Sequence, residues 1–172
     1  MVKNRYRLIL FLMLCQLSLM GFAANFYFKS SSFTHHGSIP PRFTCDGQNI
    51  PPTLFWQNPP PKTKSFALIV EDADSVSGEF VHWLLFNIPA NAWFLRWSEK
   101  LPPGTISGRN SFGTLGYRGP CPPNGSHHYF FKLFVLDKML KLNSTATRDD
   151  LIAAMRGHIL KTRELMGVYS AS

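Results

Sequence analysis

Clusters of adjacent prolines interrupt this chain at five places and limit how long any regular element between them can be. Proline has no backbone N–H and cannot stand in the interior of a sheet, so each cluster is expected to lie in a loop. Two apolar runs rich in β-branched and aromatic residues lie between the third and fourth clusters, and a third run follows the last cluster, as is typical of buried strands. Many short strands predict a mainly β domain of packed sheets. The clusters are Pro40-Pro41, Pro51-Pro52, Pro59-Pro60-Pro61, Pro102-Pro103 and Pro122-Pro123, and the runs are Ser65 to Glu71, Phe80 to Ile88 and Tyr129 to Leu136.

A helical pattern follows the third apolar run. Thr147 and Asp150 have the spacing of a capping box at a helix N-terminus. The apolar residues that follow recur on one helical face, namely Leu151, Ile152, Met155, Ile159 and Leu160. The sequence therefore predicts one late helix, continuing through Leu160, that covers the β core.

The first 23 residues have the layout of an export signal. Three basic residues precede an apolar run from Leu8 to Met20, and small residues then offer a cleavage site after Ala23. The alternatives are an uncleaved membrane anchor and a lipid anchor on Cys15. We expect a signal peptide at residues 1–23 and a single domain at residues 24–172, exported to the periplasm or secreted.

The excess of positive charge is moderate once the signal is set aside. The chain has 18 Lys and Arg against 10 Asp and Glu, and the signal holds three of the basic residues and none of the acidic ones. The remainder carries 15 minus 10, or +5. Its basic residues form no run interleaved with aromatics, which favours a solvated surface over nucleic-acid binding. A weak contact with anionic lipid surfaces is compatible with this charge.

The cysteine count agrees with export. Removal of Cys15 with the signal leaves only Cys45 and Cys121. An oxidising compartment would favour a disulfide between them, and two free thiols are the alternative.

Residues capable of binding chemistry gather at the start of the third run. Side chains alternate across a strand, so His127 and Tyr129 are expected to face one side and His128 the other. The first two can therefore share a pocket.

His82, in the second run, shares a strand face with apolar residues, so its imidazole needs a polar partner. Asp72, which follows the first run, is a candidate: its carboxylate would set the tautomer of His82 and favour the charged form. A charged imidazole is a good partner for an anion.

The segment from Gly116 to Gly125 lies immediately before His127 and combines glycines with prolines. Glycines let backbone N–H groups approach a ligand, and prolines stiffen the loop. Backbone donors beside imidazoles suit phosphate or carboxylate. The alternative is a proline-rich loop beside histidines that are satisfied within the core.

Four ordered blocks of this chain resemble the phosphatidylethanolamine-binding protein (PEBP) family, in its bacterial and archaeal Raf-kinase-inhibitor-like branch. The blocks are IPPRFTCDGQNIPPTLFW, SFALIVEDADSVSGEFVHWLLFNIPA, GRNSFGTLGYRGPCPPNGSHHYFFKLFVLD and the helical LIAAMRGHILKTRELMGVY. The resemblance implies a mainly β fold of two packed antiparallel sheets with a C-terminal helix. It also implies a small pocket for phosphate, phosphoethanolamine or similar anions.

The resemblance assigns ligand-binding positions residue by residue. Asp72 and Asp74 match the family's acidic loop, His82 the histidine of the next strand, and His127 and Tyr129 the residues after the proline loop. A disulfide between Cys45 and Cys121 is similar to one in family members with cysteines at both places. The complete predicted site is Asp72, Asp74, His82, Gly119, Pro120, Cys121, Pro122, Pro123, His127 and Tyr129.

Three classes of function follow from this sequence. The favoured one is a binding module for a small anionic ligand, without a cofactor or a metal. The second is an inhibitor or regulatory partner of a protease or kinase-type target, as the family name implies for some relatives. The third is a metal- or histidine-dependent phosphoester hydrolase, in which the two histidines and an aspartate hold a metal or serve acid–base chemistry. The absence of tight metal-ligand spacing and of a serine nucleophile motif argues against the third class.

Overall fold

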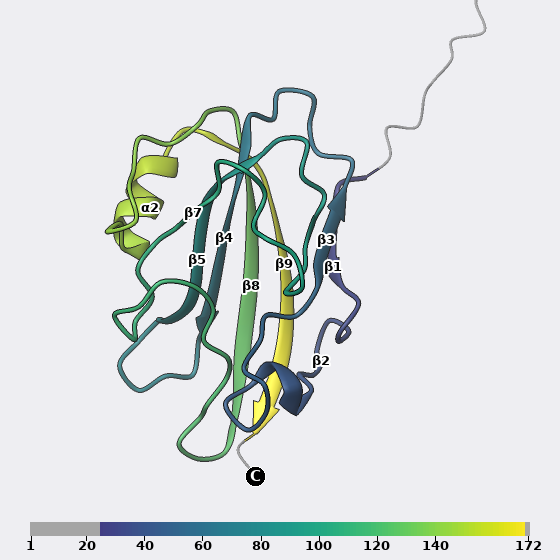
Figure 1. Ribbon diagram of the computed structural model, residues 1–172, viewed down its shortest axis with the longest axis vertical. Coiled ribbons are helices and arrows are strands. Elements are labelled where there is room, and N and C mark those ends of the chain that lie inside the picture. Colours follow the sequence, from purple (N-terminus) through teal and green to yellow (C-terminus); the bar gives the residue numbers. More distant parts are fainter. Residues whose placement is uncertain (1–24, 171–172) are drawn as a thin grey trace, which may run out of the picture.

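The computed structural model describes residues 25–170 and consists of two sheets and one α-helix (Figure 1). The predicted signal and Cys15 lie outside the described residues. The smaller sheet has the antiparallel order β1 (Tyr27–Ser30), β3 (Leu54–Gln57), β6 (Phe94–Leu95). The larger sheet has the order β2 (Gly37–Ser38), β9 (Ile159–Ser170), β8 (Ser126–Leu136), β4 (Ser65–Asp72), β5 (Phe80–Pro89), β7 (Ile106–Ser107).

The three predicted strands are confirmed as β4, β5 and β8, the neighbouring central strands of the larger sheet. All eight residues of β4 are buried, because both faces of this sheet are covered. Phe66, Leu68 and Val70 pack in a core between the sheets, whereas Ala67 and Ile69 pack in a second core on the other face. This double coverage explains why the strands are continuous apolar runs instead of alternating ones.

The second core lies under helix α2 (Arg148–Met155), whose buried residues are Leu151 and Met155. Thr147 and Asp150 form the predicted capping box, in which the hydroxyl of Thr147 accepts the N–H of Asp150. The mainly β fold class with one covering helix is thereby confirmed.

The predicted length of the helix is wrong. The helix ends at Met155, Gly157 takes a positive φ of 75°, and Ile159 already belongs to β9. Strand β9 pairs with β8 over nearly its whole length, from Ile159 beside Leu136 to Ser170 beside Ser126. A long backbone ladder has overridden a helical apolar pattern, so the described residues end in a strand of the larger sheet instead of a helix.

A buried carboxylate connects α2 to the sheet. Glu71 of β4 is only 1% exposed. It accepts hydrogen bonds from Lys132 Nζ and, at 2.8 Å, from Arg148 Nε at the start of the helix.

No helix within residues 25–170 is long and apolar enough to cross a membrane.

Candidate ligand-binding site

A pocket forms where β4 ends and β5 and β8 begin. Asp72 closes β4, and the sheet register places it beside Phe80 on one side and Tyr129 on the other. Residues from the strand ends and the adjoining loops surround a hollow of about 200 Å³. Its lining consists of Asp72, Ser75, Val76, Phe80, His82, Phe112, Cys121, Pro123, Asn124 and His127.

Asp72 and His127 are joined by a short hydrogen bond in this pocket. His127 Nδ1 lies 2.7 Å from Asp72 Oδ2, and the two side chains are only 12% and 7% exposed. The other carboxylate oxygen accepts the backbone N–H of Asp74 at 2.9 Å. A carboxylate can only accept, so Nδ1 of His127 carries the proton and Nε2 is left for a ligand.

His82 is buried and is held by the loop that precedes β8. Its Nδ1 lies 2.7 Å from the carbonyl oxygen of Arg118, while the N–H of Arg118 donates to the carbonyl of His82 at 3.0 Å. Because the carbonyl only accepts, Nδ1 donates, and Nε2 of this imidazole is also uncommitted. Burial lowers the pKa of His82, against the opposing influence of the Arg118 carbonyl and the charge of Asp72.

These contacts correct the predicted pairing of His82. Asp72 hydrogen-bonds to His127, and a backbone carbonyl sets the tautomer of His82 instead. The expectation that His82 is held in its charged form is also wrong, because desolvation outweighs the attraction of Asp72 and lowers the pKa.

Two predicted site residues support the pocket without lining it. Asp74 accepts the backbone N–H and the Nδ1 proton of His128, both at 2.7 Å, and these bonds lower the pKa of Asp74. His128 is exposed and lies outside the lining, as the alternation of side chains predicted. Tyr129 is fully buried, with its ring centroid 5.3 Å from that of His82. It therefore packs behind the imidazoles.

Three more predicted site residues position the loop that carries Cys121. The N–H of Gly119 donates to Asn49 Oδ1 at 2.7 Å, and the N–H of Cys45 donates to the carbonyl of Pro120 at 3.0 Å. A Cβ on Gly119 would lie 2.2 Å from a backbone carbonyl oxygen, so this close approach requires glycine. Pro122 is buried. These residues fasten the loop and do not line the pocket.

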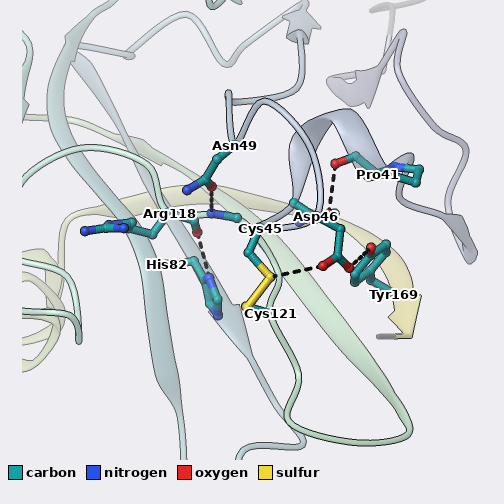
Figure 2. The surroundings of a disulfide bond; sticks show 10 residues. Pro41, Cys45, Asp46, Asn49, His82, Arg118, Cys121 and Tyr169 are labelled. Atoms are coloured by element: carbon teal, nitrogen blue, oxygen red, sulfur yellow. Dashed lines mark hydrogen bonds between the residues drawn. A yellow bond between two sulfur atoms is a disulfide. The ribbon is translucent and has the colours of Figure 1, made fainter. Parts of the chain in front are cut away.

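The predicted disulfide between Cys45 and Cys121 is present, with the two Cα atoms 5.4 Å apart. Figure 2 shows the disulfide near the ring of His82, whose Nδ1 is hydrogen-bonded to the backbone carbonyl of Arg118. Asp46, beside the bond, accepts the hydroxyl of Tyr169. The disulfide and this hydrogen bond join the turn after the short 3₁₀ helix Pro41–Phe43 to the pocket loop and to β9.

Comparison with known proteins identifies the family of this chain. The family model "Phosphatidylethanolamine-binding protein" matches residues 29–170, nearly all of the described chain. This chain belongs to the PEBP family. The "UPF0098 protein" of Methanothermobacter thermautotrophicus is 46% identical over 145 residues, which cover 82% of this chain and 96% of that protein.

Two solved PEBP structures share the fold. CT736 of Chlamydia trachomatis, described as a PEBP homolog, has a TM-score of 0.81 at 34% identity, and the match covers 86% of this chain and 98% of CT736. YbcL of E. coli, described as a member of the mammalian PEBP family, has a TM-score of 0.80 at 32% identity and covers 87% and 100% of the two chains. The protein is thus a binding protein with the PEBP fold.

The structure adds aromatic and loop residues that sequence reasoning missed. The Phe80 and Phe112 rings meet edge to face at 4.9 Å, and each lies 5.5 Å from the His82 ring. Phe80 precedes His82 by two residues on one strand, so alternation could have found it. Phe112 comes from a separate loop and has no such signal. The other additions, Ser75, Val76 and Asn124, belong to loops that the family motifs already marked.

The pocket between Asp72, His82 and His127 combines groups suited to holding a polar ligand. Two imidazoles each have Nδ1 committed to the protein and Nε2 uncommitted, and two phenylalanine rings stand beside them. Larger hollows exist, including one of about 440 Å³ around Trp93 and Leu101. The charged groups of that hollow are Arg96, Glu99 and Lys100, and Arg96 pairs with Glu99. The larger hollow has no histidine in its lining, whereas the smaller pocket has two, so the smaller pocket is the better candidate for a specific ligand.

Proposed function

We propose that this PEBP-family protein is an exported binding protein that holds a small anionic group, such as phosphate or a phosphoryl headgroup, in the pocket. The observation that carries the proposal is the commitment of both Nδ1 atoms: His82 to a carbonyl and His127 to Asp72. The two Nε2 atoms of one small hollow are thereby available to the same ligand.

Protonation would turn this pocket into an anion site. When both imidazoles are charged, each Nε2–H can donate a charge-assisted hydrogen bond to a phosphate oxygen. Asp72 offsets the charge of His127, and the carbonyl of Arg118 accepts from His82 in either protonation state. The ring of Phe80 would hold the ammonium of phosphoethanolamine through a cation–π contact, whereas the guanidinium of Arg118 already lies over the ring of Phe112.

The proposal of export has support from the disulfide. The described cysteines are paired, as expected in an oxidising compartment. Cleavage after Ala23 would give a mature chain of residues 24–172, and the intact mass of protein recovered from the exported fraction would reveal it.

Replacing His127 with alanine is expected to weaken binding of phosphoethanolamine and inorganic phosphate by roughly ten- to a hundredfold, the range for one hydrogen bond to a charged group. Calorimetric titration of the protein would measure this change. His128→Ala is the matched control, because the exposed His128 contacts Asp74 outside the pocket lining. This variant should bind both ligands with almost the wild-type affinity.

Equal losses in the two variants would contradict the assignment of the pocket. The same conclusion would follow if only the His127→Ala protein lost its cooperative unfolding, since the residue would then be structural. Absence of binding of either ligand by the wild-type protein would favour the alternative in which the pocket contacts a protease or another protein target.

Anion binding is also expected to take up a proton. Burial lowers the pKa of His82, so the free protein holds this imidazole neutral near pH 7, whereas a bound anion favours its charged form. Sulfate is a suitable probe because it keeps its charge over this range. The sulfate affinity should increase by up to about tenfold for each unit by which the pH falls from about 8 to about 6.

The variant His82→Asn isolates this contribution. Its amide can still donate to the carbonyl of Arg118 but cannot take up a proton. The pH dependence of sulfate binding should be shallower in the variant by close to one proton. An unchanged slope would show that His82 does not bind the anion.

A further inference from the structure

The excess of basic over acidic residues in this protein comes from three short segments that are far apart in the sequence. Residues 58–64, 137–141 and 156–163 contain seven of the 15 Lys and Arg of residues 24–172 and one of the 10 Asp and Glu. The remainder has eight basic and nine acidic residues, so these segments hold the whole excess charge. The residues are Lys62, Lys64, Lys138, Lys141, Arg156, Lys161 and Arg163, with Asp137 as the acid.

The fold brings the three segments to one end of the larger sheet, here called the basic end. The first segment leads into β4, the second follows β8, and the third leads into β9. The register places Ser65 beside Leu136 and Leu136 beside Ile159, so these strand ends are immediate neighbours. In Figure 1 they lie at the top of the molecule.

Most of the charge at the basic end faces solvent. Lys62, Lys64 and Lys161 are exposed, and the single acid, Asp137, is paired with His158 at 2.9 Å. Two large apolar side chains are also exposed there: Met139 at 49% and Ile159 at 44%. Lysines around a few exposed apolar groups match the charge and depth of an anionic phospholipid interface.

The chain enters the described fold at this same end. Asn58 Nδ2 lies 3.4 Å from the carbonyl oxygen of Asn25, and Arg163 Nε donates to the carbonyl of Phe26 at 2.9 Å. The exposed apolar side chains of Met139 and Ile159 among these cations favour a lipid surface over other polyanions as the occupant, because only a bilayer offers an apolar phase beside its anionic groups.

We propose that the basic end docks on anionic phospholipid bilayers. The ligand pocket lies at the opposite ends of β4 and β8, roughly 25 Å away by the rise of an eight-residue strand. This separation exceeds the Debye length at physiological salt, about 8 Å. Because the pocket is at the opposite end of the sheet, docking through the basic end leaves the pocket facing away from the bilayer, where it can receive soluble ligands. The docking surface does not depend on the proposed ligand.

Flotation of the protein with vesicles tests the docking surface. Residues 24–172 are suitable, because the match to the folded CT736 chain covers 98% of that chain and 86% of this one. We expect binding to vesicles of phosphatidylcholine with phosphatidylglycerol that falls with added salt, and much less binding to phosphatidylcholine alone. The variant Lys62→Glu/Lys161→Glu should bind at least about tenfold more weakly.

The control variant Arg42→Glu/Lys100→Glu has the same net charge but alters exposed residues outside the basic end. It should bind vesicles within about twofold of the wild-type protein. Equal losses in the two variants, or no wild-type binding to anionic vesicles, would overturn the proposal. Competition by soluble phosphoethanolamine would also overturn it, because the pocket would then be the contact.

Discussion

Replacing Cys45 and Cys121 with serine is expected to lower the free energy of unfolding by about 4 kcal/mol. The bond joins residues 76 positions apart, and a loop of that length restricts the unfolded chain strongly in the chain-entropy description of disulfides. The folded state also loses the tether between the turn that holds Asp46 and the loop that lines the pocket. Urea unfolding of the oxidised protein and the double variant would measure the difference.

Reduction provides an independent check of the same bond. The wild-type protein in dithiothreitol should become as unstable as the double variant, whereas the variant should not respond to the reductant. A difference in stability below about 1 kcal/mol would contradict the chain-entropy estimate, because the bond would then add little restriction to the unfolded chain.

Replacing Glu71 with alanine is expected to destabilise the fold by about 3 to 5 kcal/mol. The carboxylate is buried between Lys132 and Arg148, and its removal leaves two cations partly buried without their main partner. The contact also connects helix α2 to the larger sheet. The loss should be visible as a lower urea midpoint with an unchanged dependence on denaturant.

Glu79 offers a matched control for this prediction, because it contacts the same guanidinium from a solvent-exposed position. Its side chain is 53% exposed, against 2% for Glu71. An exposed pair contributes at most about 1 kcal/mol, so Glu79→Ala should be nearly as stable as the wild-type protein. Similar effects of the two substitutions would mean that burial of Glu71 carries no special cost.

The ligand site divides into a part that sequence could predict and a part that it could not. The residues Asp72, His82 and His127 carry recognisable motif positions, and the structure brings them into one pocket. The hydrogen-bond partner of each histidine could not be predicted from the sequence, because it depends on loop geometry that no local pattern specifies. The carbonyl of Arg118 came to His82 only through the reciprocal backbone bonding of loop and strand.

The fold divides in the same way into features that local sequence determined and features that tertiary structure decided. Local sequence by itself determined the central strands, the proline loops and the helix N-terminus, because each depends on residue type and short-range spacing. Tertiary structure decided that the helix stops at Met155 and that residues 159–170 join β8, since a ladder of backbone hydrogen bonds outweighs an amphipathic pattern. It also decided that lysines from three distant segments meet at one end of the sheet, because only strand order and register bring those segments together.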